Sequence, residues 1–165
     1  MLPGRKAVRL PGYDYSRPGY YFVTICAYRN ECICGDIQNS ILVPTAIGQL
    51  VRSMWMSIPE HYAHVGLDQF VLMPNHVHGI VVISKDRQLR EPCGSATLGQ
   101  IIGSYKAAVT RAVRQDMGFQ GQLWHRGFHE HIIRNEASLA RIRAYIEANP
   151  TRWGKDPEMR KKEHT

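Results

Sequence analysis

Two apolar runs separated only by Pro74 and Asn75 constrain the fold of this chain more than any other feature. Residues 67–73 and 76–83 are rich in β-branched and aliphatic side chains, and a proline followed by an asparagine favours a tight turn. We therefore predict two antiparallel strands. Beyond its first residues the second run is apolar on both faces, and a strand of this kind is covered on both sides of its sheet.

The remaining segments alternate between strand and helix patterns. Two have strand patterns: 20–27 and 128–134. Three have apolar residues three and four apart, as amphipathic helices do: 44–62, 97–117 and 136–149. Thr45 is the expected N-cap of the first helix, and Pro150 is expected to end the last one. Residues 29–39 are predicted to form a ribbon or loop, and 85–96 a polar loop.

The order of these elements is β-α-β-β-α-β followed by one more helix, which predicts an α+β protein. The first six elements match the ferredoxin-like plan, in which one antiparallel sheet carries helices on one face. The opposite face of the sheet is available to the additional C-terminal helix. Along the chain we predict an N-terminal arm at 1–18, one domain at 19–153 and a charged tail at 154–165.

The composition favours a nucleic-acid partner. The chain of 165 residues has 21 Lys and Arg against 14 Asp and Glu, which gives a formal net charge of +7. Such a balance attracts polyanions, with nucleic acid first among them. The N-terminal residues lack the apolar region of a secretion signal, and no apolar run reaches about 18 residues. We therefore expect a cytoplasmic protein without a membrane span.

Two histidines open the second apolar run. Residues two apart on a strand point to the same side, so His76 and His78 share one face, with Val77 on the other. Two neutral imidazoles on one face are the start of a metal site, which needs a third ligand from the covering element. His129 and His131 have the same spacing in the last predicted strand. The apolar surroundings favour the first pair.

The last predicted helix contains the residue types that such a site lacks. Tyr145 and Asn149 are four apart and therefore lie on one face of that helix. If the helix packs over the two histidines, the Asn149 carbonyl oxygen can complete a three-ligand site with Tyr145 beside it. Tyr105 is the rival tyrosine, but its helical neighbour is Val109, which cannot bind metal. We interpret Tyr105 as a core residue.

Several stretches of the sequence resemble one family of DNA-processing enzymes. MPNHVHGIV, Met73 to Val81, resembles the histidine-hydrophobic-histidine (HUH) signature of single-tyrosine transposases from small bacterial insertion sequences. RLPGYDY, YYFVTIC, LWHRGFHEHIIRNE and YIEANPTRW resemble the REP-associated branch of that group. The similarity covers residues 9–153. It implies that His76 and His78 are metal ligands, that Tyr145 is the nucleophile and that Asn149 holds the position of the third ligand, where many relatives have Gln.

The resemblance implies transesterification of single-stranded DNA near hairpins, with a covalent 5′-phosphotyrosine intermediate and a divalent ion, Mg²⁺ or Mn²⁺. A tyrosine with an ordinary pKa near 10 needs help to ionise, and Lys106 or Arg111 are candidates besides the metal. DNA contacts are expected from basic residues, with Trp124 as a possible stacking partner. The basic candidates are Lys106, Arg111, Arg114, Arg126 and Arg134.

Three alternatives remain open at this point. A ferredoxin-like sheet is also the plan of the RNA-recognition motif, which predicts exposed aromatic residues on the central strands. A catalytically silent, sequence-specific DNA-binding regulator derived from a transposase would keep the DNA binding without the reaction. A metal hydrolase would use water and would still cut DNA after Tyr145→Phe. The sequence is compatible with a monomer or a homodimer.

Overall fold

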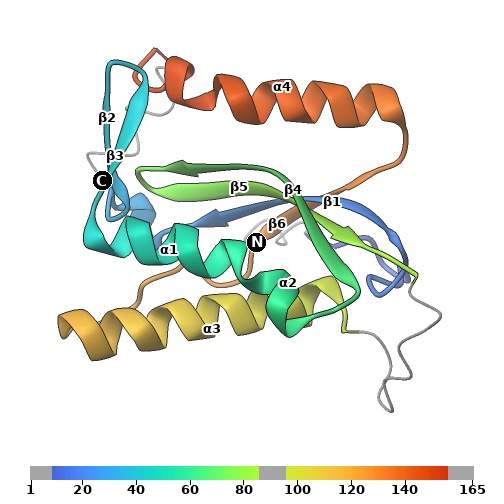
Figure 1. Cartoon of the computed structure of the whole chain (residues 1–165), viewed down its shortest axis with the longest axis horizontal. Coiled ribbons are helices and arrows are strands. Elements are labelled where there is room, and N and C mark those ends of the chain that lie inside the picture. Colours follow the sequence, from blue (N-terminus) through green and yellow to red (C-terminus); the bar gives the residue numbers. More distant parts are fainter. Residues whose placement is uncertain (1–8, 86–95, 156–165) are drawn as a thin grey trace, which may run out of the picture.

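The computed structural model describes residues 9–85 and 96–155 (Figure 1). The first eight residues of the predicted arm, most of the predicted polar loop, and the predicted tail beyond residue 155 lie outside the described part of the chain. Within the described ranges, no helix combines the length and apolar character that crossing a membrane requires.

The centre of the molecule is a four-stranded antiparallel sheet with the strand order β4-β5-β1-β6. Its strands are β1 (Gly19–Cys26), β4 (Val65–Met73), β5 (His76–Ile83) and β6 (His129–Ile133). Pro74 and Asn75 form the two-residue connection between β4 and β5, because Met73 pairs directly with His76. The strand order and the antiparallel pairing confirm the ferredoxin-like plan.

Helices cover both faces of this sheet (Figure 1). On one face lie α1 (Ala46–Met56), α2 (Ile58–His61) and α3 (Leu98–Met117). The Thr45 hydroxyl accepts a hydrogen bond from the Gly48 amide and caps α1, as predicted, while Thr97 caps α3. On the opposite face α4 (Glu136–Arg152) runs across the sheet, which confirms the predicted position of the additional helix.

The larger apolar core lies between the sheet and the helices α1 and α3. Alternate residues of β1 and β5 point into it, including Val23, Val77 and Val81. Trp55 of α1 lies directly over Gly79 of β5, where an added Cβ would come within 2.3 Å of the indole. Glycine therefore allows the indole to approach the sheet backbone at this point of an otherwise apolar strand.

A smaller core lies under α4. Its buried members are Ile80, Ile133, Leu139 and Ile146. A bidentate ion pair supplements it: the Arg143 Nε and Nη2 atoms donate to the two carboxylate oxygens of Asp68 on β4, at 2.8 and 2.6 Å. The few apolar contacts and this ion pair together hold α4 on the sheet.

Three segments differ from the prediction. The single helix expected over 44–62 is divided at Ser57 into α1 and α2. Residues after β1 form a short 3-10 turn, η1 (Tyr28–Asn30), and then a hairpin of β2 (Gly35–Gln38) and β3 (Ile41–Pro44), of which β3 was not expected. The prediction that Pro150 ends the last helix is wrong, because α4 continues to Arg152. A proline in the last turn removes one amide donor but leaves the turn intact: the Trp153 amide still donates to the Asn149 carbonyl.

Tyr105 is part of the larger core, as interpreted from the sequence. It is 4 % exposed, and its hydroxyl donates a 2.8 Å hydrogen bond to the Val51 carbonyl. Burial raises the pKa of this phenol well above its usual value. A tyrosine enclosed in this way has no access to a substrate.

Candidate functional site

The two histidines at the start of β5 lie under α4, on the face opposite the larger core. His76 and His78 are 7 % and 6 % exposed, and their ring centroids are 4.5 Å apart. Their position follows from the strand alternation, which puts Val77 into the core behind them. The competing pair, His129 and His131, is exposed on the edge strand β6.

The ring of His76 is oriented by its neighbour Asn75. The Asn75 side-chain nitrogen donates to the Asn30 carbonyl at 3.2 Å, which turns its carbonyl oxygen towards His76 Nδ1 at 2.6 Å. Since an amide oxygen only accepts, His76 Nδ1 carries the proton and donates it. Nε2 then carries the lone pair, as in histidines that bind metal while donating the other ring N–H to a carbonyl.

The ring of His78 is held by the neighbouring strand. Its Nδ1 atom lies 2.8 Å from the Thr24 hydroxyl on β1, in a cross-strand pair that the register places side by side. Phe22 stacks on the other side, with ring centroids 5.3 Å apart. Burial, and to a smaller extent the neighbouring His76, lowers the pKa of His78 to about 3. The imidazole is therefore neutral at physiological pH.

Tyr145 of α4 lies beside His78. The two ring centroids are 5.4 Å apart, and the phenol also meets Phe22 edge-on at 6.1 Å. Unlike the histidines, Tyr145 is 40 % exposed. The arrangement brings one accessible phenol to the edge of a buried pair of imidazoles.

Asn149 lies one turn after Tyr145 and is 2 % exposed. Its side-chain nitrogen donates a 2.9 Å hydrogen bond to the Tyr145 carbonyl, so the amide oxygen is the atom available for another partner. Trp153, in the same end of the helix, lies 6.3 Å from the His76 ring between centroids. Among the residues that the structure describes, no three His, Cys, Asp or Glu side chains are grouped to hold a metal.

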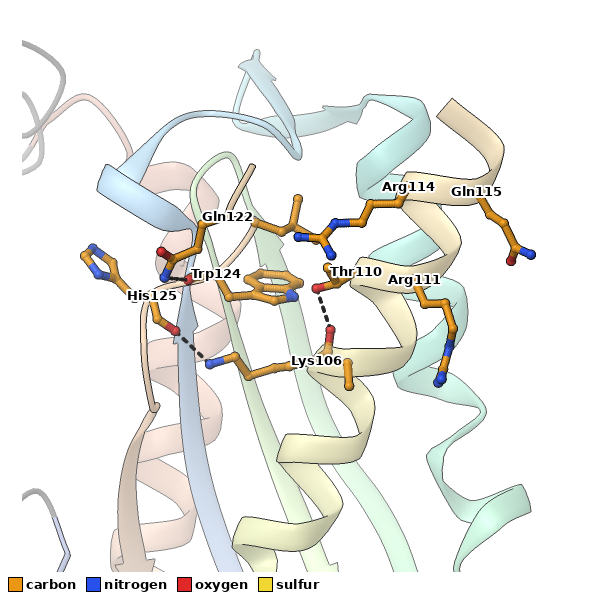
Figure 2. Close-up of a pocket in the computed structure, with 10 residues that line it drawn as sticks. Lys106, Thr110, Arg111, Arg114, Gln115, Gln122, Trp124 and His125 are labelled. Carbon is orange, nitrogen blue, oxygen red and sulfur yellow. Dashed lines mark hydrogen bonds between the residues drawn. The ribbon is translucent and has the colours of Figure 1, made fainter. Parts of the chain in front are cut away.

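The predicted basic residues are distributed over two regions. Lys106, Arg111 and Arg114 line an open pocket of about 810 Å³ along α3, with Trp124 and His125 opposite (Figure 2). Because α3 and α4 cover opposite faces of the sheet, Lys106 and Arg111 do not lie beside the Tyr145 phenol. The Lys106 Nζ atom instead donates to the His125 and Gly127 carbonyls. Trp124 is 5 % exposed and belongs to the core.

Arg126 and Arg134 are closer in sequence to β6. Arg126 lines a second cavity together with Thr24, and Arg134 directly follows the strand. Three residues near the histidines were not identified from the sequence: Thr24, Asn75 and Trp153. An asparagine immediately before a candidate ligand was a readable signal for Asn75. Thr24 was not readable in this way, because its role depends on the register between β1 and β5.

Comparisons with known proteins identify the family of this chain. A family model described as "Transposase IS200 like" matches residues 15–149. An uncharacterized protein of Haemophilus influenzae is 36% identical over 92% of this chain and 91% of its own length. A solved structure of a REP-associated tyrosine transposase bound to a REP hairpin has a TM-score of 0.59 at 18% identity, covering 88% of this chain and 74% of that one.

A second solved structure, a putative transposase from Deinococcus radiodurans, has a TM-score of 0.49 at 17% identity, over 84% of this chain and 95% of that one. The family model covers most of the chain and includes the histidine pair, Tyr145 and Asn149. The resemblance drawn from MPNHVHGIV is thereby confirmed at the level of the family: the chain belongs to the IS200-like transposases.

Proposed function

We propose that this protein is a metal-dependent transesterase that cleaves and rejoins single-stranded DNA near hairpins through a covalent phosphotyrosine. The observation that carries the proposal is the approach of Tyr145 to the histidine pair, with its ring centroid 5.4 Å from that of His78. An exposed phenol beside two buried imidazoles suits a nucleophile that works next to a metal ion. The REP hairpin bound by the similar transposase structure supports a hairpin substrate.

In the proposed reaction the Tyr145 oxygen attacks a backbone phosphorus atom. The bond between oxygen and phosphorus forms as the bond from phosphorus to the 3′-oxygen breaks. The phenol loses its proton to solvent, which reaches the 40 % exposed side chain, and the leaving 3′-oxygen takes up a proton. The 5′-phosphate stays on the enzyme as a phosphodiester. Because one phosphodiester replaces another, a 3′-hydroxyl can reverse the step without ATP.

The donor set fits a divalent cation. His76, His78 and the Asn149 amide oxygen would hold it, and the hydrogen bonds of Asn75 and Thr24 leave Nε2 as the ligating atom of each ring. A bound Mg²⁺ or Mn²⁺ would neutralise charge on the non-bridging oxygens of the scissile phosphate. Imidazole ligands shift the preference from Mg²⁺ towards Mn²⁺. The chain itself contributes the orientation of the rings and the position of the phenol.

A denaturing gel tests the proposal. Labelled single-stranded hairpin DNA incubated with the protein and Mn²⁺ is expected to give a covalent adduct that survives denaturation. Tyr145→Phe and His76→Ala should each lower its rate of formation by at least about a thousandfold, because the nucleophile and metal ligand act as a unit. Removal of the ion by a chelator should have the same effect.

Two matched variants serve as controls. Tyr105→Phe also removes one phenolic hydroxyl, and His131→Ala removes one imidazole of the competing pair; both should retain the adduct. Specific binding of the hairpin without any adduct would instead identify a DNA-binding regulator. Cleavage that persists in Tyr145→Phe would identify a hydrolase that uses water.

A further inference from the structure

We propose that the cavity beside the histidine pair, between the end of β1 and residues 125–129, binds one unpaired nucleotide next to the scissile phosphate. The protein would then read the identity of a base at the cleavage point through its own side chains. This inference rests on the proposed function and adds a specificity site to it. The cavity has a volume of about 530 Å³, within the range of small-ligand sites.

The position of the cavity connects it to the reaction. Thr24 lines it and at the same time holds His78 Nδ1 at 2.8 Å. In the register of the sheet, Thr24 pairs with His78 on one side and with His129, which also lines the cavity, on the other. The cavity therefore begins one strand away from the proposed metal ligand. A DNA strand whose phosphate lies beside Tyr145 has its neighbouring nucleotide within reach of this wall.

The lining has the chemistry that an unpaired nucleotide requires. Its side chains include two cations and several hydrogen-bonding groups but no carboxylate: Arg9, Thr24, Cys26, Asn30, His125, Arg126, Phe128 and His129, with Gly127. Phe128 is the aromatic member, and the Arg9 guanidinium lies 5.1 Å from its ring centroid. Aromatic rings and guanidinium planes stack on exposed bases, while arginines bind the phosphates on either side.

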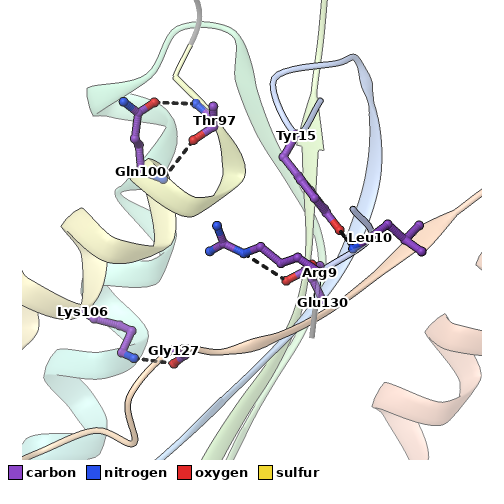
Figure 3. A network of polar contacts seen from close by, with 8 residues as sticks. All are labelled: Arg9, Leu10, Tyr15, Thr97, Gln100, Lys106, Gly127 and Glu130. Atoms are coloured by element: carbon purple, nitrogen blue, oxygen red, sulfur yellow. Dashed lines mark hydrogen bonds and ion pairs between the residues drawn. The ribbon is translucent and has the colours of Figure 1, made fainter. Parts of the chain in front are cut away.

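The walls of the cavity are held in place from outside. Lys106 reaches across from α3 and donates to the His125 and Gly127 carbonyls, so it fixes the loop that forms one wall (Figure 3). On the arm, Arg9 Nε lies 3.8 Å from the buried carboxylate of Glu130. Rigid walls of this kind reduce the entropy that binding costs, which is expected of a site that discriminates between ligands.

Asn30 forms the opposite wall in a strained conformation. Its φ angle is +56°, and the preceding Arg29 has a φ of +54°, a region that residues other than glycine occupy infrequently. The hydrogen bond from the Asn75 side chain to the Asn30 carbonyl holds this turn. The Asn75 side chain therefore bonds both to the cavity wall, at Asn30, and to His76. The cavity and the histidine site are joined by these two hydrogen bonds.

The test measures how the removal of a DNA base and the removal of a protein side chain, separately and together, change the rate of adduct formation. Hairpin DNA with randomised flanks is first cleaved by the wild-type protein with Mn²⁺, and sequencing of the products locates the cleaved bond. Abasic sites are then placed at each of the two flanking nucleotides. In the wild type, one abasic position should lower the single-turnover rate of adduct formation about tenfold, as expected for loss of one stacked base.

In Asn30→Gly and Phe128→Leu, the penalty for the same abasic site should fall to about twofold or less, because the contact is already missing. Glycine suits the positive φ at position 30, so the turn is retained. Asn39→Gly is the matched control: Asn39 also has a positive φ, of 52°, but lies at the turn between β2 and β3. This variant should keep the full penalty.

The failure of the subsite and the failure of the proposed function give different results. If the wild type forms no adduct with any DNA, the proposed function is wrong. If it forms the adduct but the flanking bases have no effect, or the abasic penalty is equal in all variants, the subsite is wrong while the function stands.

Discussion

At the scale of single residues, the site depends on two imidazoles that are held in different ways. His76 donates its Nδ1 proton to the Asn75 amide oxygen, whereas His78 is desolvated between Phe22 and the Thr24 hydroxyl. Neutral imidazole is the form that binds metal, so the lowered pKa of His78 suits its proposed role as a ligand. Preparing His78 in this way has a consequence for stability at low pH.

The pKa of His78 falls from 6.5 in the unfolded chain to about 3 in the fold, mainly through burial and secondly through His76. Between these values the unfolded chain binds one more proton than the folded one, so acidification lowers the free energy of unfolding. The loss is at most about 1.4 kcal/mol per pH unit and ends near the folded value. His78→Gln should therefore be less sensitive to pH than the wild type in urea unfolding at about pH 7, 6 and 5. Parallel curves would contradict this assignment.

At the scale of secondary structure, α4 packs on a smaller apolar core than the helices of the other layer. The buried part of its apolar contact has four residues, whereas α1 and α3 pack on the large core. The ion pair of Arg143 with Asp68 is bidentate, and the guanidinium lowers the pKa of the Asp68 carboxyl. Since Tyr145 lies two residues further along α4, the pair orients the helix that carries the proposed nucleophile.

We expect Arg143→Gln to lower the rate of adduct formation about tenfold, because a displacement of about 1 Å at the reacting atoms costs more than that. The pair is partly exposed, so the free energy of unfolding should fall by less than about 1 kcal/mol. The exchanged variant Asp68→Arg with Arg143→Asp should recover part of the rate. The positioning role would be contradicted if the rate of adduct formation fell only as far as the free energy of unfolding and did not recover in the exchanged double variant.

At the scale of the whole molecule, the sheet separates two surfaces that use the net charge of +7 differently. On the α4 face, Tyr145 lies beside the histidine pair, and the proposed chemistry is local. On the other layer, Lys106, Arg111 and Arg114 line the open pocket of Figure 2. Basic residues along a helix favour contact with the DNA backbone, which contributes affinity without base specificity.

This separation predicts how affinity depends on salt. Replacing one phosphate-binding arginine, in Arg111→Gln, should reduce the slope of log K against log salt concentration by about 0.7 for single strands or about 0.9 for a duplex stem. Arg52→Gln removes the same charge from α1, outside this pocket, and should leave the slope unchanged. Fluorescence anisotropy with labelled hairpin DNA measures both. Equal slopes for Arg111→Gln and the wild type would exclude a phosphate contact at Arg111.

Much of the fold was readable because its signals are local. The same-side position of His76 and His78 on a strand and the three- and four-residue spacing of the helices depend on backbone geometry alone, and Thr45 caps its helix through a neighbour three residues away. The hairpin of β2 and β3 was missed because its strands have four residues each and its turn uses Asn39 and Ser40, which adopt positive φ without glycine. The predicted end of α4 was wrong because a proline in the last turn of a helix removes only one backbone hydrogen bond.

By itself, then, the sequence determined that His76 and His78 share a strand face and that Tyr145 and Asn149 share a helix face, since each relation spans a few residues of regular backbone. Only the tertiary structure decided that these two faces meet. Their meeting depends on the packing of α4 and its ion pair with Asp68, and on the register that brings Thr24 to His78. Contacts between distant parts of the chain are selected by the packing of the whole fold, which no local period encodes.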